Sequence, residues 1–201
     1  MTESNITNVS GPGIPIRGNN IDTDRIIPAR FLRTVTFDGL GAHAFEDDRK
    51  QAGGKHPFDD SRFADSAILL VNKNFGSGSS REHAPQALQR WGIRAVVGQS
   101  FGEIFFGNSL TLGIPCAVLT EDEINQLQDA ADADPKAEIT LDLRAGTIAM
   151  GDLSFAAQVP KTARESLLSG RWDALGELLG APDETRAVYD RLAYIAGFTG
   201  Q

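Results

Sequence analysis

The middle of this sequence alternates short apolar runs with stretches of helical periodicity. The apolar runs predict buried strands at residues 67–71, 94–98 and 115–119. The amphipathic stretches predict helices at residues 85–91, at residues 99–110 after a turn, and from Thr120 onward, where Thr120–Glu123 has the pattern of a capping box. Because strands and helices alternate, we expect a mixed α/β fold around one core.

The two ends of the chain have other patterns. Residues 11–17 predict a short strand after a frayed terminus. Alternating apolar and polar positions predict a small antiparallel sheet, with strands at residues 137–143, 147–150 and 153–159 and a turn at residues 144–146. Glycines and Pro182 then separate two terminal helices, which we expect at residues 161–180 and 183–196.

The pattern between residues 20 and 60 is irregular. Asp24 can cap a helix, but Pro28 suits a first helical position, so we expect the helix to open at Pro28. Residues 33–41 predict a loop with apolar contacts, either a lid or a segment packed on the core. Residues 47–60 are charged and rich in glycine, and they predict a solvated connection.

Charge and hydropathy exclude several classes of function. With 19 Lys and Arg against 27 Asp and Glu, the 201-residue chain has a formal net charge of −8, which argues against a nucleic-acid partner. It leaves room for a small anionic substrate held by a local arginine. No apolar run approaches the ~18 residues of a membrane span. Residues 1–10 lack the pattern of a signal peptide, so we expect a cytoplasmic protein with no membrane partner.

A single cysteine, Cys116, limits the metal chemistry of the chain. One cysteine cannot form an internal disulfide or supply the ligands of a structural zinc or an iron–sulfur cluster. Its apolar neighbours predict a buried structural thiol. The three histidines are scattered without metal-ligand spacing, so we expect this chain to bind no metal by itself.

The clearest chemical signal is the turn at residues 74–83, with the sequence NFGSGSSREH, between a predicted strand and a predicted helix. A Gly- and Ser-rich turn in this position directs several backbone N–H groups at one spot that suits an anion. Arg81 adds a planar guanidinium that can hold a carboxylate at two points, and Ser79 and Ser80 add hydroxyls. Because Pro85 belongs in the first turn of a helix, a distinct turn should precede the regular helix and leave N–H groups free for a ligand.

The turn does not match commoner motifs. It lacks the lysine of a P-loop, the third glycine of a dinucleotide fingerprint and the flanking glycines of a nucleophile elbow. Local chemistry therefore leaves two interpretations open, an anion-binding turn and a merely structural one. The acidic segment at residues 22–24 also has two interpretations: turn and capping chemistry, or an acidic side chain that reaches the Ser/Arg turn.

Three segments together resemble one protein family. They are DTDRIIP at residues 22–28, FGSGSSREHA at residues 75–84 and SFGEIFFGN at residues 100–108. In this combination they are similar to the small-subunit family of 3-isopropylmalate dehydratases, which is related to the swivelling C-terminal domain of aconitase. The resemblance covers about residues 11–160. It implies a single swivelling β/β/α domain over residues 1–201, with mixed sheets flanked by helices and a helical extension from about residue 161 to 201.

The resemblance also implies a reaction and a partner. In this family a large subunit carries a 4Fe–4S cluster, and the complex interconverts 2- and 3-isopropylmalate by dehydration and rehydration in leucine biosynthesis. Transferred to this sequence, Ser79 is the catalytic base that removes and returns the proton on carbon. Ser80 and Arg81 hold a carboxylate of the small hydroxy-dicarboxylate substrate, and Asp24 lies close to them.

The segment at residues 31–34 lies where related enzymes select between an apolar side chain and an extra carboxylate on the substrate. Arg33 favours the extra carboxylate, as in homoaconitase-like proteins, whereas Val35, Phe37 and Leu40 favour an isopropyl group. We expect isopropylmalate to be the substrate. Two alternatives stay open: the small subunit of a homoaconitase-like or other hydroxy-diacid hydro-lyase, and a non-catalytic anion-binding or regulatory module that kept the turn.

Overall fold

The computed structural model describes residues 5–33, 36–79, 81–173, 176, 178 and 180–192. Within these residues, seven strands form one sheet in the order β4-β3-β2-β1-β5-β6-β7. The strands are β1 (Asn8–Ile16), β2 (Ile68–Val71), β3 (Ala95–Gly98), β4 (Cys116–Val118), β5 (Glu138–Asp142), β6 (Thr147–Met150) and β7 (Leu153–Ala156). The predicted strands are thus confirmed, although β1 begins three residues earlier than expected.

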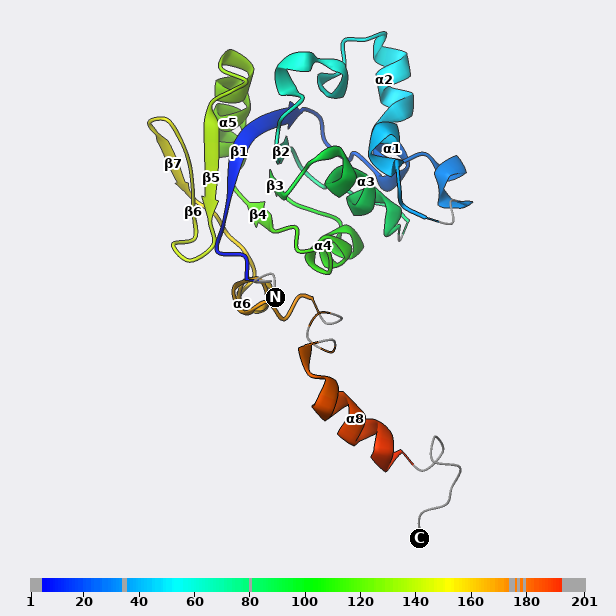
Figure 1. Cartoon of the computed structure of the whole chain (residues 1–201). Coiled ribbons are helices and arrows are strands. Elements are labelled where there is room, and N and C mark those ends of the chain that lie inside the picture. Colours follow the sequence, from blue (N-terminus) through cyan, green and yellow to red (C-terminus); the bar gives the residue numbers. More distant parts are fainter. Residues whose placement is uncertain are drawn as a thin grey trace.

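The long strand β1 joins two halves of the sheet. Its first part, Asn8–Pro12, pairs antiparallel with β5, and its second part, Gly13–Ile16, pairs parallel with β2. The remaining pairs are parallel from β2 to β4 and antiparallel from β5 to β7. Figure 1 shows β1 in blue between β5 and β2. The predicted antiparallel strands are therefore confirmed, and β1 joins them to the parallel strands in one sheet because it is long enough to pair with both groups.

Helices connect these strands. The α-helices are α1 (Thr23–Ile26), α2 (Glu46–Ala52), α3 (His83–Trp91), α4 (Glu103–Leu110), α5 (Glu121–Ala133), α6 (Lys161–Ser169) and α8 (Pro182–Arg191). The 3₁₀ helices are η1 (Ala29–Arg33), η2 (Leu40–His43), η3 (Pro57–Asp59) and η4 (Ser61–Phe63). The capping box that opens α5 is confirmed, with Thr120 and Glu123 bonded to each other's backbone N–H groups.

For residues 20–60, one expectation is confirmed in part and one is wrong. A helix does open after Pro28, but it is the 3₁₀ helix η1. The helix α1 comes before it, and its N-cap is Asp22 rather than Asp24, because the Asp22 carboxylate accepts from the Arg25 N–H at 2.9 Å. The stretch after residue 46 contains α2 instead of a solvated connection. Acidic residues occupy the first turn of α2 and basic residues its last turn, which complements the helix dipole. Gly53 ends α2 in the left-handed conformation, with φ of 56°.

The sheet separates two apolar cores, as the alternation of its side chains requires. Leu69 and Val71 face the side covered by α3 and α4, where Phe105 is also buried. Ile68 and Leu70 face the other side, which is covered by α5 and α6. Cys116 is buried on the α3 side, as predicted for a structural thiol.

The C-terminal segments differ in how they pack. The helix α6 buries Leu167, whose carbonyl accepts from the Ile6 N–H at 3.0 Å. By contrast, α8 buries none of its residues and extends away from the sheet in Figure 1. The predicted helices are confirmed over α6 and α8, whereas residues 193–196 lie outside the described part of the chain.

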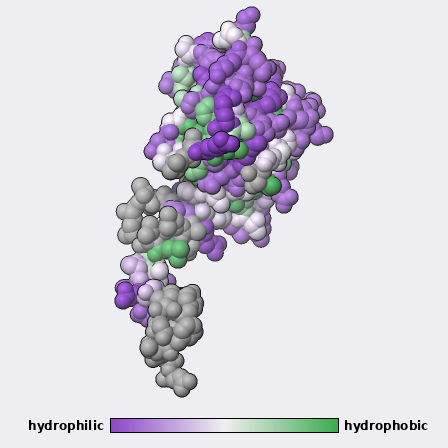
Figure 2. Space-filling model, turned by 90° about the vertical axis from the view of Figure 1, so that its right-hand side faces the viewer, coloured by the Kyte–Doolittle hydropathy of each residue, from purple (hydrophilic) through white to green (hydrophobic). Residues whose placement is uncertain are grey.

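The surface is largely hydrophilic on the side shown in Figure 2, with smaller apolar areas among the polar ones. No helix in the described part of the chain is long and apolar enough to cross a membrane.

Candidate functional site

The Ser/Arg turn follows β2 and is held by backbone hydrogen bonds from two neighbouring segments. The Phe75 N–H donates to the Ser100 carbonyl at 3.0 Å, and the Gly76 N–H donates to the Ile21 carbonyl at 2.7 Å. Gly76 has φ of 71°, and a Cβ there would lie 2.3 Å from the ring of Phe105. A glycine at this position therefore lets the turn lie directly on the core.

Thr23, at the start of α1, holds the next part of the turn. Its backbone N–H donates to the Ser77 carbonyl at 2.9 Å, and its hydroxyl donates to the Ser79 carbonyl at 3.1 Å. Thr23 is only 2% exposed, so both hydrogen bonds are shielded from water. The backbone at Ser79 is thus fixed from the buried side while its side chain faces outward.

Several donors of the turn are available to a ligand. The backbone N–H groups of Gly78, Ser79 and Arg81 donate to no acceptor among the described residues. The Ser79 side chain is exposed, and within the same residues its hydroxyl makes no hydrogen bond. The helix α3 begins at His83 and includes Pro85 in its first turn, so a distinct turn does precede the regular helix.

Arg81 contacts the acidic segment at residues 22–24. Its Nη1 donates to the Oδ1 of Asp24, and the two side chains are 11% and 53% exposed, respectively. The Nε of Arg81 is buried and has no hydrogen-bond partner among the residues that the structure describes. Both interpretations of the acidic segment therefore hold, because Asp22 caps α1 and Asp24 reaches the turn.

Ser79 and Arg81 line one cavity of about 490 Å³. Its lining residues in the described part of the chain are Leu32, Ser79, Arg81, Glu82, His83 and Asn108. Sequence reasoning placed Leu32 in the substrate-selecting segment at residues 31–34, but it assigned no role to Glu82 or Asn108. The only signal for Asn108 was its place at the end of the third family segment.

None of the other predicted site residues is among the described lining residues of this cavity, and two of them lie outside the described part of the chain. The ring of Phe37 packs edge-on against the imidazole of His83, with 5.1 Å between the ring centroids, so this part of the 33–41 loop reaches the turn. Arg33 ends η1 with an exposed side chain and is not among the lining residues. Ser80 and Val35 lie outside the described residues.

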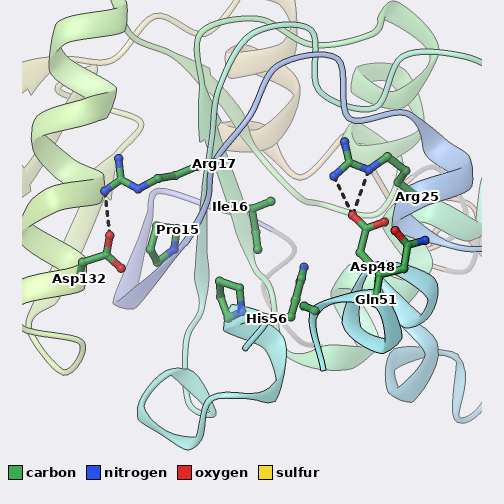
Figure 3. Close-up of a pocket in the computed structure, with 10 residues that line it drawn as sticks. Pro15, Ile16, Arg17, Arg25, Asp48, Gln51, His56 and Asp132 are labelled. Carbon is green, nitrogen blue, oxygen red and sulfur yellow. Dashed lines mark hydrogen bonds and ion pairs between the residues drawn. The ribbon is translucent and has the colours of Figure 1, made fainter. Parts of the chain in front are cut away.

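A larger cavity, of about 670 Å³, lies beside the end of β1, and its described lining residues include none of the predicted site residues. Figure 3 shows Arg17 beside Asp132 on one side of it and Arg25 beside Asp48 on the other. His56 lies between them, and burial lowers the pKa of its imidazole below the usual 6.5. Both arginines of this cavity are paired with aspartates, and no segment of the Ser/Arg turn contributes to its described lining.

The described residues offer no group of three or more His, Cys, Asp or Glu side chains that could hold a metal ion. Iron–sulfur clusters are held by several thiolates. Burial raises the pKa of the Cys116 thiol to about 12, so the one cysteine of the chain is held in its protonated form. The donor set of this chain therefore does not fit a 4Fe–4S cluster.

Comparisons with known proteins agree on one family. The aconitase C-terminal domain matches residues 4–120. The small subunit of 3-isopropylmalate dehydratase from Synechocystis is 50% identical over 192 residues, which cover 96% of each chain. The same subunit from a strain of Thermus thermophilus is 43% identical, over 94% of this chain and 95% of its own.

A solved structure has the same fold. The crystal structure of 3-isopropylmalate dehydratase from Methanocaldococcus jannaschii matches with a TM-score of 0.66 and 25% identity, over 87% of this chain and 98% of its own. Sequence, fold and the geometry of the turn are thus in agreement. The chain belongs to the aconitase C-terminal domain family and, within it, to the small subunits of 3-isopropylmalate dehydratase.

Proposed function

We propose that this chain and a large subunit together form a 3-isopropylmalate dehydratase, a hydro-lyase that interconverts 2- and 3-isopropylmalate in leucine biosynthesis. The observation that carries the proposal is that Ser79 and Arg81 line one cavity, on a turn where the N–H groups of Gly78, Ser79 and Arg81 have no acceptor among the described residues. The names of the relatives supply the substrate and the need for a second subunit.

Arg81 binds a substrate carboxylate in this proposal. Asp24 holds one end of the guanidinium, which fixes its orientation. The buried Nε lacks an acceptor among the described residues, and an unsatisfied buried donor is costly. A small rearrangement of the turn that brings a carboxylate oxygen to Nε would remove this cost with a charge-assisted hydrogen bond. We assign the Ser80 hydroxyl to the same carboxylate.

Ser79 is the base that takes the proton from carbon. A serine oxygen is a weak base unless its alkoxide is stabilised. The N–H groups of the turn and the positive charge of Arg81 provide that stabilisation. As the C–H bond breaks, its electron pair spreads into the adjacent carboxylate, where Arg81 also stabilises the developing negative charge. Rehydration from the other side reverses these steps and returns the proton from Ser79.

The leaving hydroxyl needs an acceptor that this chain does not supply. Since its donor set does not fit an iron–sulfur cluster, we assign the 4Fe–4S cluster to the large subunit and derive no step through it. The cavity beside Ser79 would then be completed by that subunit.

The substrate side chain is assigned to the apolar rim of the cavity. Leu32 lines the cavity, and Phe37 contacts its lining residue His83. These side chains suit an isopropyl group. We propose that the loop at residues 33–40, including Val35, covers this end of the substrate, and that Arg33 limits how well it rejects an extra carboxylate.

The test is an anaerobic assay of each purified chain alone and then of the mixture, with either isomer as substrate. We expect neither chain alone to turn over and the mixture to reach full activity near one to one. Isomerase activity from this chain alone, after metal removal, would overturn the two-subunit proposal. An inactive mixture with an intact cognate large subunit would overturn the assignment of the reaction.

A further inference from the structure

We propose that the exposed side of α4 is a docking surface for the large subunit. This surface, called the α4 face, consists of Glu103, Ile104, Gly107 and Thr111. The inference rests on the proposed function, because that function requires a second subunit next to the Ser79 cavity.

The spacing of these residues places them on one side of the helix. Positions three and four apart in a helix are neighbours on its surface, and the four residues follow that spacing. The opposite side of α4 packs on the core through Phe105 and Ser109, which are almost completely buried. Gly107 therefore lies near the middle of the exposed side.

Ile104 is 49% exposed. The other large hydrophobic side chains that are exposed in the described part of the chain are Leu178, Val188 and Tyr189, all beyond α6. A single exposed isoleucine is common in soluble proteins and does not by itself indicate an interface. The docking surface therefore needs support from a second feature of the same helix.

Gly107 is that feature. Glycine in a helix interior is less favourable than alanine, and it is retained where something must approach the backbone closely. A Cβ on Gly107 would meet no atom of the described residues within 4 Å, and its φ is not positive. Gly102, the N-cap of the same helix, is explained within the chain, since a Cβ there would lie 2.5 Å from the Gly76 carbonyl oxygen. The described part of the chain gives no such reason for Gly107, which points to close approach by another molecule.

The α4 face is continuous with the cavity, and this selects the large subunit as the occupant. Asn108 lies one turn after Ile104 on α4 and lines the cavity with Ser79 and Arg81. In Figure 1, α4 lies next to α3, whose N-terminal end carries the Ser/Arg turn. A chain seated on the α4 face would also cover this side of the cavity. The proposed reaction requires the large subunit next to the Ser79 cavity, and it requires no other partner there.

Two variants test the docking surface, and a third serves as a matched control. Gly107→Ala should raise the melting temperature of the isolated chain by about 2–4 °C, because it removes the cost of a helical glycine. It should also weaken binding to the large subunit by about tenfold, because a methyl group intrudes on the contact. Ile104→Asp should leave the melting temperature nearly unchanged and weaken binding by at least about tenfold. The control Val188→Asp, at a position 48% exposed on α8, should change neither quantity.

The readouts are the Kd for the purified cognate large subunit, measured anaerobically by calorimetry, and the mass of the isolated chain in solution. If the wild-type chain binds the large subunit and both α4 variants bind it with the same Kd, the docking surface is overturned and the proposed function is left intact. Failure of the wild-type chain to bind would overturn both. A shift of Ile104→Asp from dimer to monomer with unchanged Kd would assign the face to a second copy of this chain and overturn the inference.

Discussion

At the scale of single residues, the site depends on how firmly Ser79 and Arg81 are held. Thr23 fixes the carbonyls of Ser77 and Ser79 from a buried position, and Asp24 holds the guanidinium of Arg81. Hydrogen-bond donors that are already held in place do not have to be reoriented when charge develops in the transition state. Residues that hold them therefore matter for catalysis. If Ser79 and Arg81 have the roles proposed above, substitutions of their side chains should therefore affect turnover more than folding.

Ser79→Ala should lower kcat by about 10²–10⁴-fold, the usual cost of a missing general base. The exposed side chain makes no hydrogen bond within the described residues, so the variant should fold and bind the large subunit normally. The measurements are kcat of the assembled complex and Kd for the large subunit. Near-normal turnover would move the base elsewhere, with Ser80 as the next residue to test.

Arg81→Lys should lower kcat/KM by roughly 10–10²-fold although the charge is kept, because a lysine cannot offer the two-point contact of a guanidinium. The matched control is Arg25→Lys, since Arg25 also pairs with an aspartate but does not line the Ser79 cavity. The control should retain its kcat/KM. Equal values for both variants and the wild type would make the Arg81–Asp24 pair purely structural.

At the scale of elements, the proposed function assigns the loop between η1 and η2 to the end of the substrate that carries the side chain. It approaches the turn through the contact between Phe37 and His83, and the guanidinium of Arg90 on α3 also lies 5.3 Å from the Phe37 ring. These contacts tie the loop to the helix that follows the Ser/Arg turn. In the proposed function, the loop therefore influences the choice of substrate without contributing to the chemistry.

Arg33→Val should raise the preference for isopropylmalate over a substrate with an added carboxylate by roughly tenfold, within the ~1–3 kcal/mol range of ordinary pocket discrimination. The reason is the loss of a cation near the proposed substrate end. The ratio of the two kcat/KM values is the readout. An unmoved ratio would show that the loop does not select the substrate.

The short helix η3 contains a pH-sensitive cap. The Nδ1 of His56 accepts from the Phe58 N–H at 3.2 Å, and burial lowers the pKa of the imidazole below 6.5. The unfolded chain then binds the proton more readily than the folded one, so stability should fall as the pH drops through about 6.5 and below. His56→Asn keeps a capping acceptor without a titrating group. Its free energy of unfolding should fall less between about pH 7.5 and 5.5; an identical fall would assign the effect to other groups.

At the scale of the whole molecule, the described part of the C-terminal region divides into a packed helix and an exposed one. Since α8 buries no residue, a chain that ends at Gly180 should keep its melting temperature within about 2 °C. Leu167→Ala on α6 should instead destabilise by about 2–5 kcal/mol, the usual range for a buried leucine. Thermal unfolding of both variants is the measurement. A large loss on truncation would mean that the segment after Gly180 packs on the domain.

Local sequence patterns predicted most of the strands and helices, and they narrowed the turn to two interpretations. Alternation predicted β5 to β7, and the capping box predicted the start of α5, because both depend on interactions between residues close in the chain. The Gly/Ser/Arg turn after a buried strand was recognisable for the same reason, although local chemistry left open whether it binds an anion or is merely structural. The resemblance carried by three motif segments identified the family, which the comparisons confirm.

Only the tertiary structure decided how distant segments meet. The pairing of β1 with both β2 and β5 depends on its length and on two sheet edges far apart in sequence, which no local pattern encodes. The ion pair between Asp24 and Arg81 joins residues 57 positions apart. Asn108 reaches the cavity because α4 packs beside α3 over the same sheet face. Such contacts follow from the burial of apolar faces against one another, a property of the whole fold rather than of any one segment.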